Sequence, residues 1–138
     1  MTRRLFTVFL LTGLASFLGC SQNVKLSGTV TYQDDGSPVT RGAVFFETPT
    51  LVAQGDIQSD GTYVVGSTGL NDGLPKGEYS VSIRGADEIT FTPGAGGSQV
   101  ERRKALIDPK YQRADSSGLT FTVDGKTKKF DIKVDRAK

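Results

Sequence analysis

Few side chains in this sequence could carry out covalent or acid–base chemistry. Cys20 is the only cysteine, and the chain contains no histidine. A single thiol cannot form an intramolecular disulfide. Without histidine the chain can have no histidine metal site, no Ser-His-Asp triad and no Cys-His pair. Apart from the thiol, the remaining options are carboxylate pairs, Ser-Lys dyads and tyrosines.

Two carboxylates and a lysine occur in one long irregular stretch, at Glu101, Lys104 and Asp108. A catalytic carboxylate pair has to be held rigidly at a set separation. The neighbouring sequence is rich in glycine, and the spacing of these three residues matches no catalytic motif. We therefore expect no catalytic residues and a protein that is not an enzyme.

Acidic turns could supply oxygen ligands to calcium. They occur at Asp34-Asp35-Gly36 and at Asp56 together with Asp60-Gly61. Neither has the alternating acidic spacing of a dedicated calcium loop. Ordinary turn chemistry accounts for both, since aspartate bonds to nearby backbone and glycine adopts positive φ. The sequence predicts no metal site and no cofactor.

The thiol of Cys20 follows a segment that has the composition of an export signal. Arg3-Arg4 is followed by an apolar stretch over residues 5–18, then by the small residue Gly19. A basic start, an apolar stretch and a small residue before the cleavage point predict a signal peptide over residues 1–19. The stretch is shorter than the roughly 18 apolar residues that span a bilayer. Arg3-Arg4 also fits a twin-arginine signal, so both export routes remain open.

Phe17-Leu18-Gly19-Cys20 resembles the lipobox of bacterial lipoproteins. Leu18, Gly19 and Cys20 match, whereas Phe17 stands where that family usually has leucine. The resemblance implies that the Cys20 thiol receives a diacylglyceryl group and becomes the mature N-terminus, with residues 20–23 as a lipidated start and spacer. Serine rather than aspartate at position 21 implies sorting to the outer membrane of the cell envelope.

The mature part of the chain is electrically neutral. Loss of Arg3 and Arg4 lowers the Lys+Arg count from 17 to 15, which equals the 15 Asp+Glu residues. Neutrality argues against sequence-independent nucleic-acid binding, which needs many phosphate contacts. Arg102-Arg103-Lys104 and Lys126, Lys128 and Lys129 are short basic runs. We interpret them as solvated charges; the alternative is a contact with anionic lipid headgroups or an acidic polymer.

Seven short segments alternate apolar and polar side chains, which predicts half-buried β-strands. No helical periodicity occurs outside the leader, and short strands with turn residues between them predict a sandwich or barrel. The predicted strands are residues 24–32, 43–46, 51–57, 62–65, 78–84, 119–123 and 130–134. The predicted core is Leu26, Val30, Phe45, Ile57, Tyr63, Val65, Tyr79, Val81, Ile83, Leu119, Phe121, Phe130 and Ile132.

Two pairs of these segments are joined by tight turns and are expected to form hairpins. Ser59-Asp60-Gly61 joins 51–57 to 62–65, and Asp124-Gly125-Lys126 joins 119–123 to 130–134. Residues 86–117 interrupt the rhythm as an inserted loop. In that loop the Pro93–Ser98 stretch is expected to be mobile. The loop is either functional or a passive crossover between sheets.

Seven short motifs follow one another along residues 24–134. They are Leu26–Tyr32, Pro38-Val39, Gly42–Phe46, Asp60-Gly61-Thr62-Tyr63, Leu74–Tyr79, Pro109-Lys110-Tyr111 and Ser117–Thr120. This ordered set resembles the carboxypeptidase regulatory-like (transthyretin-like) domains. The resemblance implies a seven-stranded Greek-key β-sandwich of the prealbumin type that acts as a non-catalytic module over residues 24–138.

These observations together predict an exported lipoprotein, held in the membrane by lipid on Cys20. Its single domain would be a structural or protein-binding module of the cell envelope. Exposed sheet edges would allow an envelope protein to add a strand. The alternative is a carrier of a small ligand or carbohydrate, for which Tyr32, Phe91 and Tyr111 are the candidate lining residues.

Overall fold

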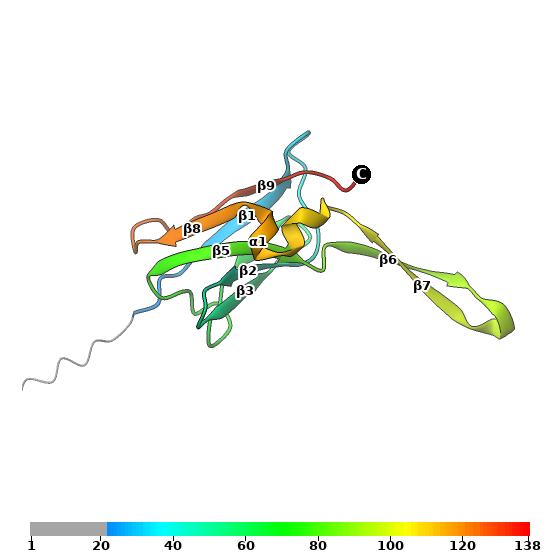
Figure 1. The fold of residues 1–138 in the computed structure, drawn as a ribbon, viewed down its shortest axis with the longest axis horizontal. Coiled ribbons are helices and arrows are strands. Elements are labelled where there is room, and N and C mark those ends of the chain that lie inside the picture. Colours follow the sequence, from blue (N-terminus) through cyan, green and yellow to red (C-terminus); the bar gives the residue numbers. More distant parts are fainter. Residues whose placement is uncertain (1–21) are drawn as a thin grey trace, which may run out of the picture.

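Nine strands and three short helical turns form in the computed structural model, which describes residues 22–138 (Figure 1). The strands are β1 (Ser27–Tyr32), β2 (Ala43–Glu47), β3 (Val52–Asp56), β4 (Thr62–Val64), β5 (Gly77–Arg84), β6 (Asp87–Pro93), β7 (Gln99–Ala105), β8 (Leu119–Val123) and β9 (Ile132–Val134). The helical turns are η1 (Ala95–Gly97), η2 (Pro109–Gln112) and α1 (Ala114–Ser117).

Seven of the strands make two packed sheets. One sheet has the order β4-β1-β9 and the other has the order β3-β2-β5-β8. Strand β1 pairs antiparallel with β4 and parallel with β9, whereas the larger sheet is antiparallel throughout. The predicted all-β, seven-stranded sandwich is confirmed. The predicted signal peptide and Cys20 lie outside the described residues. Within residues 22–138 no helix is long and apolar enough to cross a bilayer.

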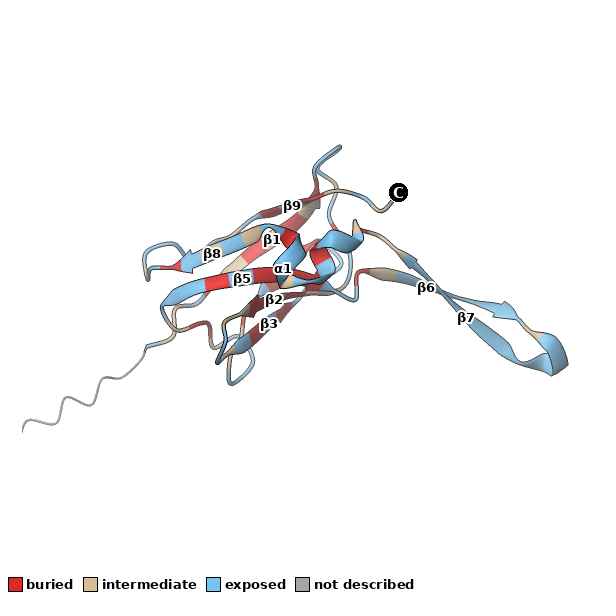
Figure 2. Ribbon diagram, viewed as in Figure 1, coloured by how far each residue is buried: buried red, intermediate tan, exposed pale blue. Residues whose placement is uncertain are grey.

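The core lies between the two sheets, where alternate side chains of each strand are buried (Figure 2). Phe46 is fully buried and is surrounded by aromatic rings. Its ring centre lies 6.3 Å from those of Tyr63 and Phe130 and 6.4 Å from those of Tyr79 and Phe121. Tilted and edge-on pairs at such distances add to the stabilisation from burial.

Most of the predicted core is confirmed, but the prediction for Phe45 is wrong. Strand β2 buries Val44 and Phe46, whereas Phe45 is half-buried on the outer face beneath the Arg84 guanidinium, 4.6 Å from its ring centre. All four residues of the run 43–46 are apolar, so the run alone does not show which alternate side chains face the core. Glu47 follows Phe45 by two residues and therefore lies on the same, outer face of the strand. The predicted core residues that are only partly buried, but packed on the core, are Leu119, Phe121 and Phe130.

Both predicted hairpins are wrong, because each turn carries the chain from one sheet to the other. Strand β3 pairs with β2 while β4 pairs with β1, and strand β8 pairs with β5 while β9 pairs with β1. The turns themselves form, with Gly61 at φ 82° and Gly125 at φ 88°. A tight turn reverses the chain but does not determine which sheet the next strand joins.

The inserted segment 86–117 is not a loop. Strands β6 and β7 form a seven-pair antiparallel hairpin that points away from the sandwich (Figure 1). The Pro93–Ser98 stretch closes it, with the Gly94 N–H donating to the Ser98 carbonyl at 2.7 Å. Residues 109–117 then return along the sandwich as η2 and α1, where Tyr111 and Ser117 are buried.

Candidate functional site

The hairpin formed by residues 87–105, here called the arm, extends from the end of strand β5. Gly85 at φ 70° changes the direction of the chain there, a conformation that glycine adopts without a steric penalty. The next residue, Ala86, is buried. The arm therefore begins directly at the edge of the core and its strands lead outwards (Figure 2).

The base of the arm is held by groups from both of its strands. The Leu106 N–H donates to the Ala86 carbonyl at 2.9 Å, which continues the hairpin pairing into the sandwich. Ile107, two residues after the end of β7, is buried in the core. The Arg41 guanidinium donates to the Asp87 carbonyl at 3.2 Å. These contacts fix where the arm leaves the sandwich.

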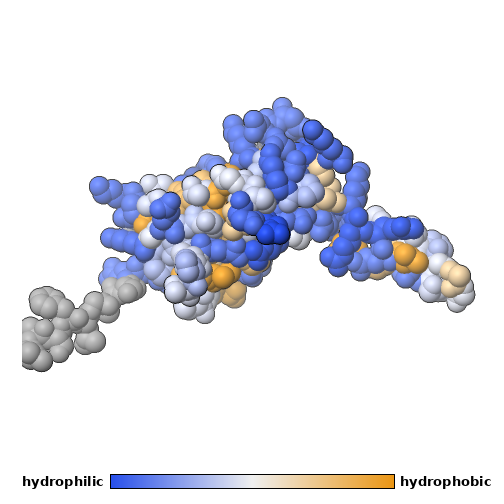
Figure 3. Space-filling model, in the orientation of Figure 1, coloured by the Kyte–Doolittle hydropathy of each residue, from blue (hydrophilic) through white to orange (hydrophobic). Residues whose placement is uncertain are grey.

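One face of the arm carries a row of apolar side chains. Directly paired residues of antiparallel strands share a face, and Ile89 pairs with Arg103 while Phe91 pairs with Glu101. Phe91 is 61% exposed and Ile89 is 40% exposed. We call Ile89, Phe91 and Pro93 the apolar face of the arm. An ion pair between Arg103 and Glu101 borders it. Apolar side chains stand out on the arm in Figure 3.

The arm also has two free strand edges. Strands β6 and β7 form a sheet of their own among the described residues. Their outward N–H and C=O groups are available to another strand. By contrast, the edge of β3 is partly occupied, because Gln54 exchanges two backbone hydrogen bonds of 2.9 and 3.1 Å with Gly66. The arm is thus more open to strand addition than the edge of β3.

The three residues considered for acid–base chemistry do not converge. Glu101 and Lys104 both lie on β7. Glu101 forms an ion pair with Arg103, and Lys104 lies opposite Glu88 in the strand register of the hairpin. Asp108 lies at the start of η2 and accepts a hydrogen bond of 3.0 Å from the Lys110 N–H. The arrangement of these residues provides no acid and base facing one another.

The three candidate aromatic residues do not line one cavity. Tyr32 is buried beneath the Arg136 guanidinium, 3.6 Å from its ring centre, and burial raises the pKa of Tyr32. Tyr111 is buried, and its hydroxyl donates to an Asp135 carboxylate oxygen at 3.1 Å. Phe91 lies far out on the arm. Each ring therefore has a separate environment.

The acidic turn Asp34-Asp35 is bonded to protein groups. Asp35 accepts hydrogen bonds from the Ser37 hydroxyl and N–H, and Arg136 contacts Asp34 and Asp35 at 2.8 Å each. The Ser37 bonds, aided by Arg136, lower the pKa of Asp35 to about 2.

The second acidic turn is satisfied in the same way. Asp60 accepts from the Thr62 hydroxyl and N–H, and these bonds lower the pKa of Asp60. Over residues 22–138 no group of three or more His, Cys, Asp or Glu side chains gathers.

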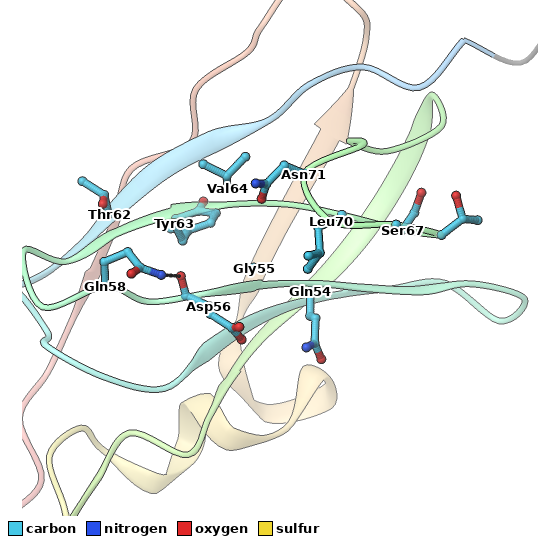
Figure 4. Close-up of a pocket in the computed structure, with 13 residues that line it drawn as sticks. Gln54, Gly55, Asp56, Gln58, Thr62, Tyr63, Val64, Ser67, Leu70 and Asn71 are labelled. Atoms are coloured by element: carbon cyan, nitrogen blue, oxygen red, sulfur yellow. Dashed lines mark hydrogen bonds between the residues drawn. The ribbon is translucent and has the colours of Figure 1, made fainter.

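An open cleft of about 640 Å³ lies between β3, β4 and the loop of residues 66–71 (Figure 4). Asp56 is the one carboxylate among its lining residues. The Tyr63 ring lies at its floor, but the hydroxyl is committed to the Phe130 carbonyl at 2.6 Å. The cleft therefore presents amide and hydroxyl groups, backbone and the apolar side chains of Val64 and Leu70 rather than a catalytic pair.

The reasoning from sequence missed the apolar face of the arm. Glu88-Ile89-Thr90-Phe91-Thr92 is a run with β-branched and aromatic residues, which favour strands. The glycine-containing stretch that follows is a hairpin signal. The signal was present, since polar and apolar residues alternate over residues 88–92, but the glycine-rich stretch of residues 93–98 and the charged run after it favoured an irregular loop.

No protein-family model and no curated protein matches this sequence. Among solved structures, the major pilin subunit of Bacillus cereus is similar with a TM-score of 0.42 and 13% identity, over 85% of this chain and 30% of the pilin chain. A 9R-lipoxygenase from Cyanothece PCC8801 gives a TM-score of 0.34 and 12% identity, over 81% of this chain and 16% of that chain. The chain thus spans less than a third of either protein, and neither similarity assigns it an activity or a partner.

Proposed function

We propose that this chain is a membrane-anchored exported lipoprotein whose β-sandwich is a non-catalytic module, and that its arm binds a protein of the cell envelope. The observation that carries the proposal is a spatial one. The described chain begins, at residue 22, at the end of the sandwich opposite to the arm, and Cys20 lies two residues before it in the sequence (Figure 1). An acyl group on Cys20 would therefore hold the body at the bilayer with the arm directed away from it.

The chemistry of the arm supports binding to a protein. A two-stranded hairpin alone is only marginally stable in water, and exposed apolar rows mark interaction surfaces. A strand from a partner would satisfy an open edge of the arm, and apolar partner side chains would cover Ile89 and Phe91. Seven residues per strand at about 3.3 Å each give the arm a reach of roughly 20 Å.

The resemblance to carboxypeptidase regulatory-like domains is part of this proposal. It is supported by the structural roles of its motif residues. The Tyr79 hydroxyl donates to the Pro75 carbonyl at 3.0 Å, and Asp60 with Gly61 forms the turn that leads into buried Tyr63. These residues build the sandwich and leave the arm as the element free to bind.

Photo-crosslinking in intact cells tests the binding role. A photoreactive phenylalanine analogue replaces Phe91 in one strain and Lys133, on the exposed side of β9, in the matched control. We expect one discrete adduct with an envelope protein from position 91 and none from position 133. No adduct from position 91, or the same adducts from both, would contradict the proposal.

A further inference from the structure

A second cleft, of about 930 Å³, lies at the end of the sandwich where the N-terminal chain emerges. It is formed by residues 22–25, by Pro75-Lys76 and by the turn of residues 124–128. Four exposed lysines lie on these three segments, and we call them the basic end. They are Lys25, Lys76, Lys126 and Lys128.

Backbone contacts bring these segments together. The Val24 N–H donates to the Leu74 carbonyl at 2.7 Å and the Leu74 N–H donates to the Val24 carbonyl at 2.9 Å. Gly125 is the meeting point, since a Cβ atom added there would lie 3.3 Å from Nζ of Lys76 and 3.9 Å from Val24. The lysines are distant in sequence but are held at one end by the fold.

The positive charge of the basic end is not compensated locally. Asp124 is the one carboxylate in the cleft lining, and it accepts hydrogen bonds from the Lys126 and Thr127 N–H groups at 2.8 and 2.9 Å. These bonds hold the pKa of Asp124 below its usual value. Over the described residues no lysine of the basic end forms an ion pair, whereas Lys110 and Lys129 do. A surplus of positive charge on a neutral domain favours an anionic partner.

We propose that the basic end docks on the anionic phospholipid headgroups of the membrane that holds the lipid on Cys20. The inference rests on the proposed function, because the anchor decides which surface the basic end meets. From Cys20 to Gln22 the chain can extend at most about 7 Å. That is within a Debye length of about 8 Å at physiological ionic strength. The lysines therefore stay in reach of headgroup charge, and the docked body points its arm away from the bilayer.

The first test uses the lipidated protein reconstituted in vesicles of neutral phosphatidylcholine, with or without 30% phosphatidylglycerol. An impermeant amine reagent then labels exposed lysines, which are quantified by mass spectrometry. With phosphatidylglycerol, we expect labelling of Lys76, Lys126 and Lys128 to slow about fivefold or more, and that of Lys104 and Lys133 to stay unchanged. High salt should remove the protection. If each lysine is labelled at the same rate with and without phosphatidylglycerol, the inference is overturned.

The second test separates this inference from the anchor. The mature chain carrying Cys20→Ser lacks the lipid but retains every residue of the described core. It should sediment with phosphatidylglycerol vesicles about 100-fold more strongly than its Lys76→Gln/Lys126→Gln/Lys128→Gln variant, at about fivefold per lysine. The charge-matched variant Lys104→Gln/Lys133→Gln/Lys138→Gln should bind within twofold of its parent.

Each further outcome has a defined meaning. If the lipidated chain fails to float with neutral vesicles, the anchor is wrong, and the Cys20→Ser comparison still decides whether the basic end binds headgroups. If the two triple variants bind the vesicles equally, the proposed docking of the basic end on headgroups is overturned, while the proposed lipid anchor on Cys20 is unaffected. Protection by 10 mM inorganic phosphate or by soluble polyglutamate, without protection by vesicles, would also overturn the docking on lipid.

Discussion

The hydroxyl of Tyr63 donates a hydrogen bond of 2.6 Å to the backbone carbonyl of Phe130. Strand β1 lies between the two residues, and Gly28 of β1 pairs directly with Tyr63. A Cβ atom at Gly28 would clash with the Phe130 carbonyl and would lie 2.9 Å from the Tyr63 hydroxyl. The absence of a side chain at Gly28 thus lets the phenol pass over β1 and connect β4 to the chain that leads into β9.

Removing the Tyr63 hydroxyl should destabilise the sandwich. Tyr63→Phe keeps the buried ring but leaves the Phe130 carbonyl without this donor, which costs about 1–2 kcal/mol. The measurement is urea denaturation of the Cys20→Ser mature chain followed by circular dichroism. An unchanged free energy of unfolding would show that the carbonyl finds another donor.

Adding a methyl group at Gly28 should lower the free energy of unfolding more than adding one at a glycine whose only requirement is a positive φ. Gly28→Ala places an atom against the Phe130 backbone, so we expect a loss above about 3 kcal/mol or a failure to fold. The matched control is Gly36→Ala, since Gly36 has φ 71° and open space around it. It should lose only about 1 kcal/mol. Equal losses in the two variants would refute the close approach at Gly28.

The loop beside the first cleft should respond to acid through Asp72. Its carboxylate accepts from the Thr68 hydroxyl and from the N–H groups of Ser67, Thr68 and Gly69, and these bonds lower its pKa from 3.8 to about 2. Because the folded pKa is the lower one, this stabilisation is complete above about pH 4 and is lost as the pH falls towards 2.

Two measurements check the behaviour of Asp72. The carboxyl carbon of Asp72 should titrate with a midpoint near pH 2 in an NMR experiment. Asp72→Asn should be less stable than its parent at pH 7, with the difference shrinking between pH 4 and pH 2. A titration midpoint near 3.8, or a stability difference that does not depend on pH, would contradict the bonding described here.

The apolar face of the arm should matter for binding and hardly at all for folding. Ile89→Ser/Phe91→Ser removes exposed side chains, so the free energy of unfolding should change by less than about 0.5 kcal/mol. Phe46→Ala, at the centre of the core, should cost about 3–5 kcal/mol by the same measurement. The double variant should also lose the partner recovered by crosslinking at the arm. Retention of the partner by a folded double variant would exclude this face as the contact.

The strands that could be predicted from the sequence are those with one face on the core. Tyr79, Val81 and Ile83 alternate with polar residues and face the core, although Ser82, on the opposite face of β5, is also buried. Strand pairing could not be predicted in this way. Turns at Gly61 and Gly125 have local causes, but whether the next strand continues the same sheet depends on packing across the whole sandwich.

The two candidate surfaces differ in what the sequence reveals of them. Lys126 and Lys128 form a visible basic run, but Lys25 and Lys76 join them only through the pairing of Val24 with Leu74. Ile89 and Phe91 alternate with polar residues as in a core-facing strand, but both faces of β6 are exposed, so the alternation does not reveal that these side chains lie on the surface. Surfaces assembled from distant segments or projecting from the core become recognisable only in three dimensions.

The mass of the mature N-terminal peptide tests the central claim most directly, which is that the sandwich is anchored to the membrane through Cys20. Trypsin cleaves after Lys25, so the lipidated protein should release a peptide of residues 20–25. We predict that this peptide begins at Cys20 and carries a diacylglyceryl group on its sulfur. A mature chain that begins elsewhere, or a Cys20 with a free thiol, would contradict the account.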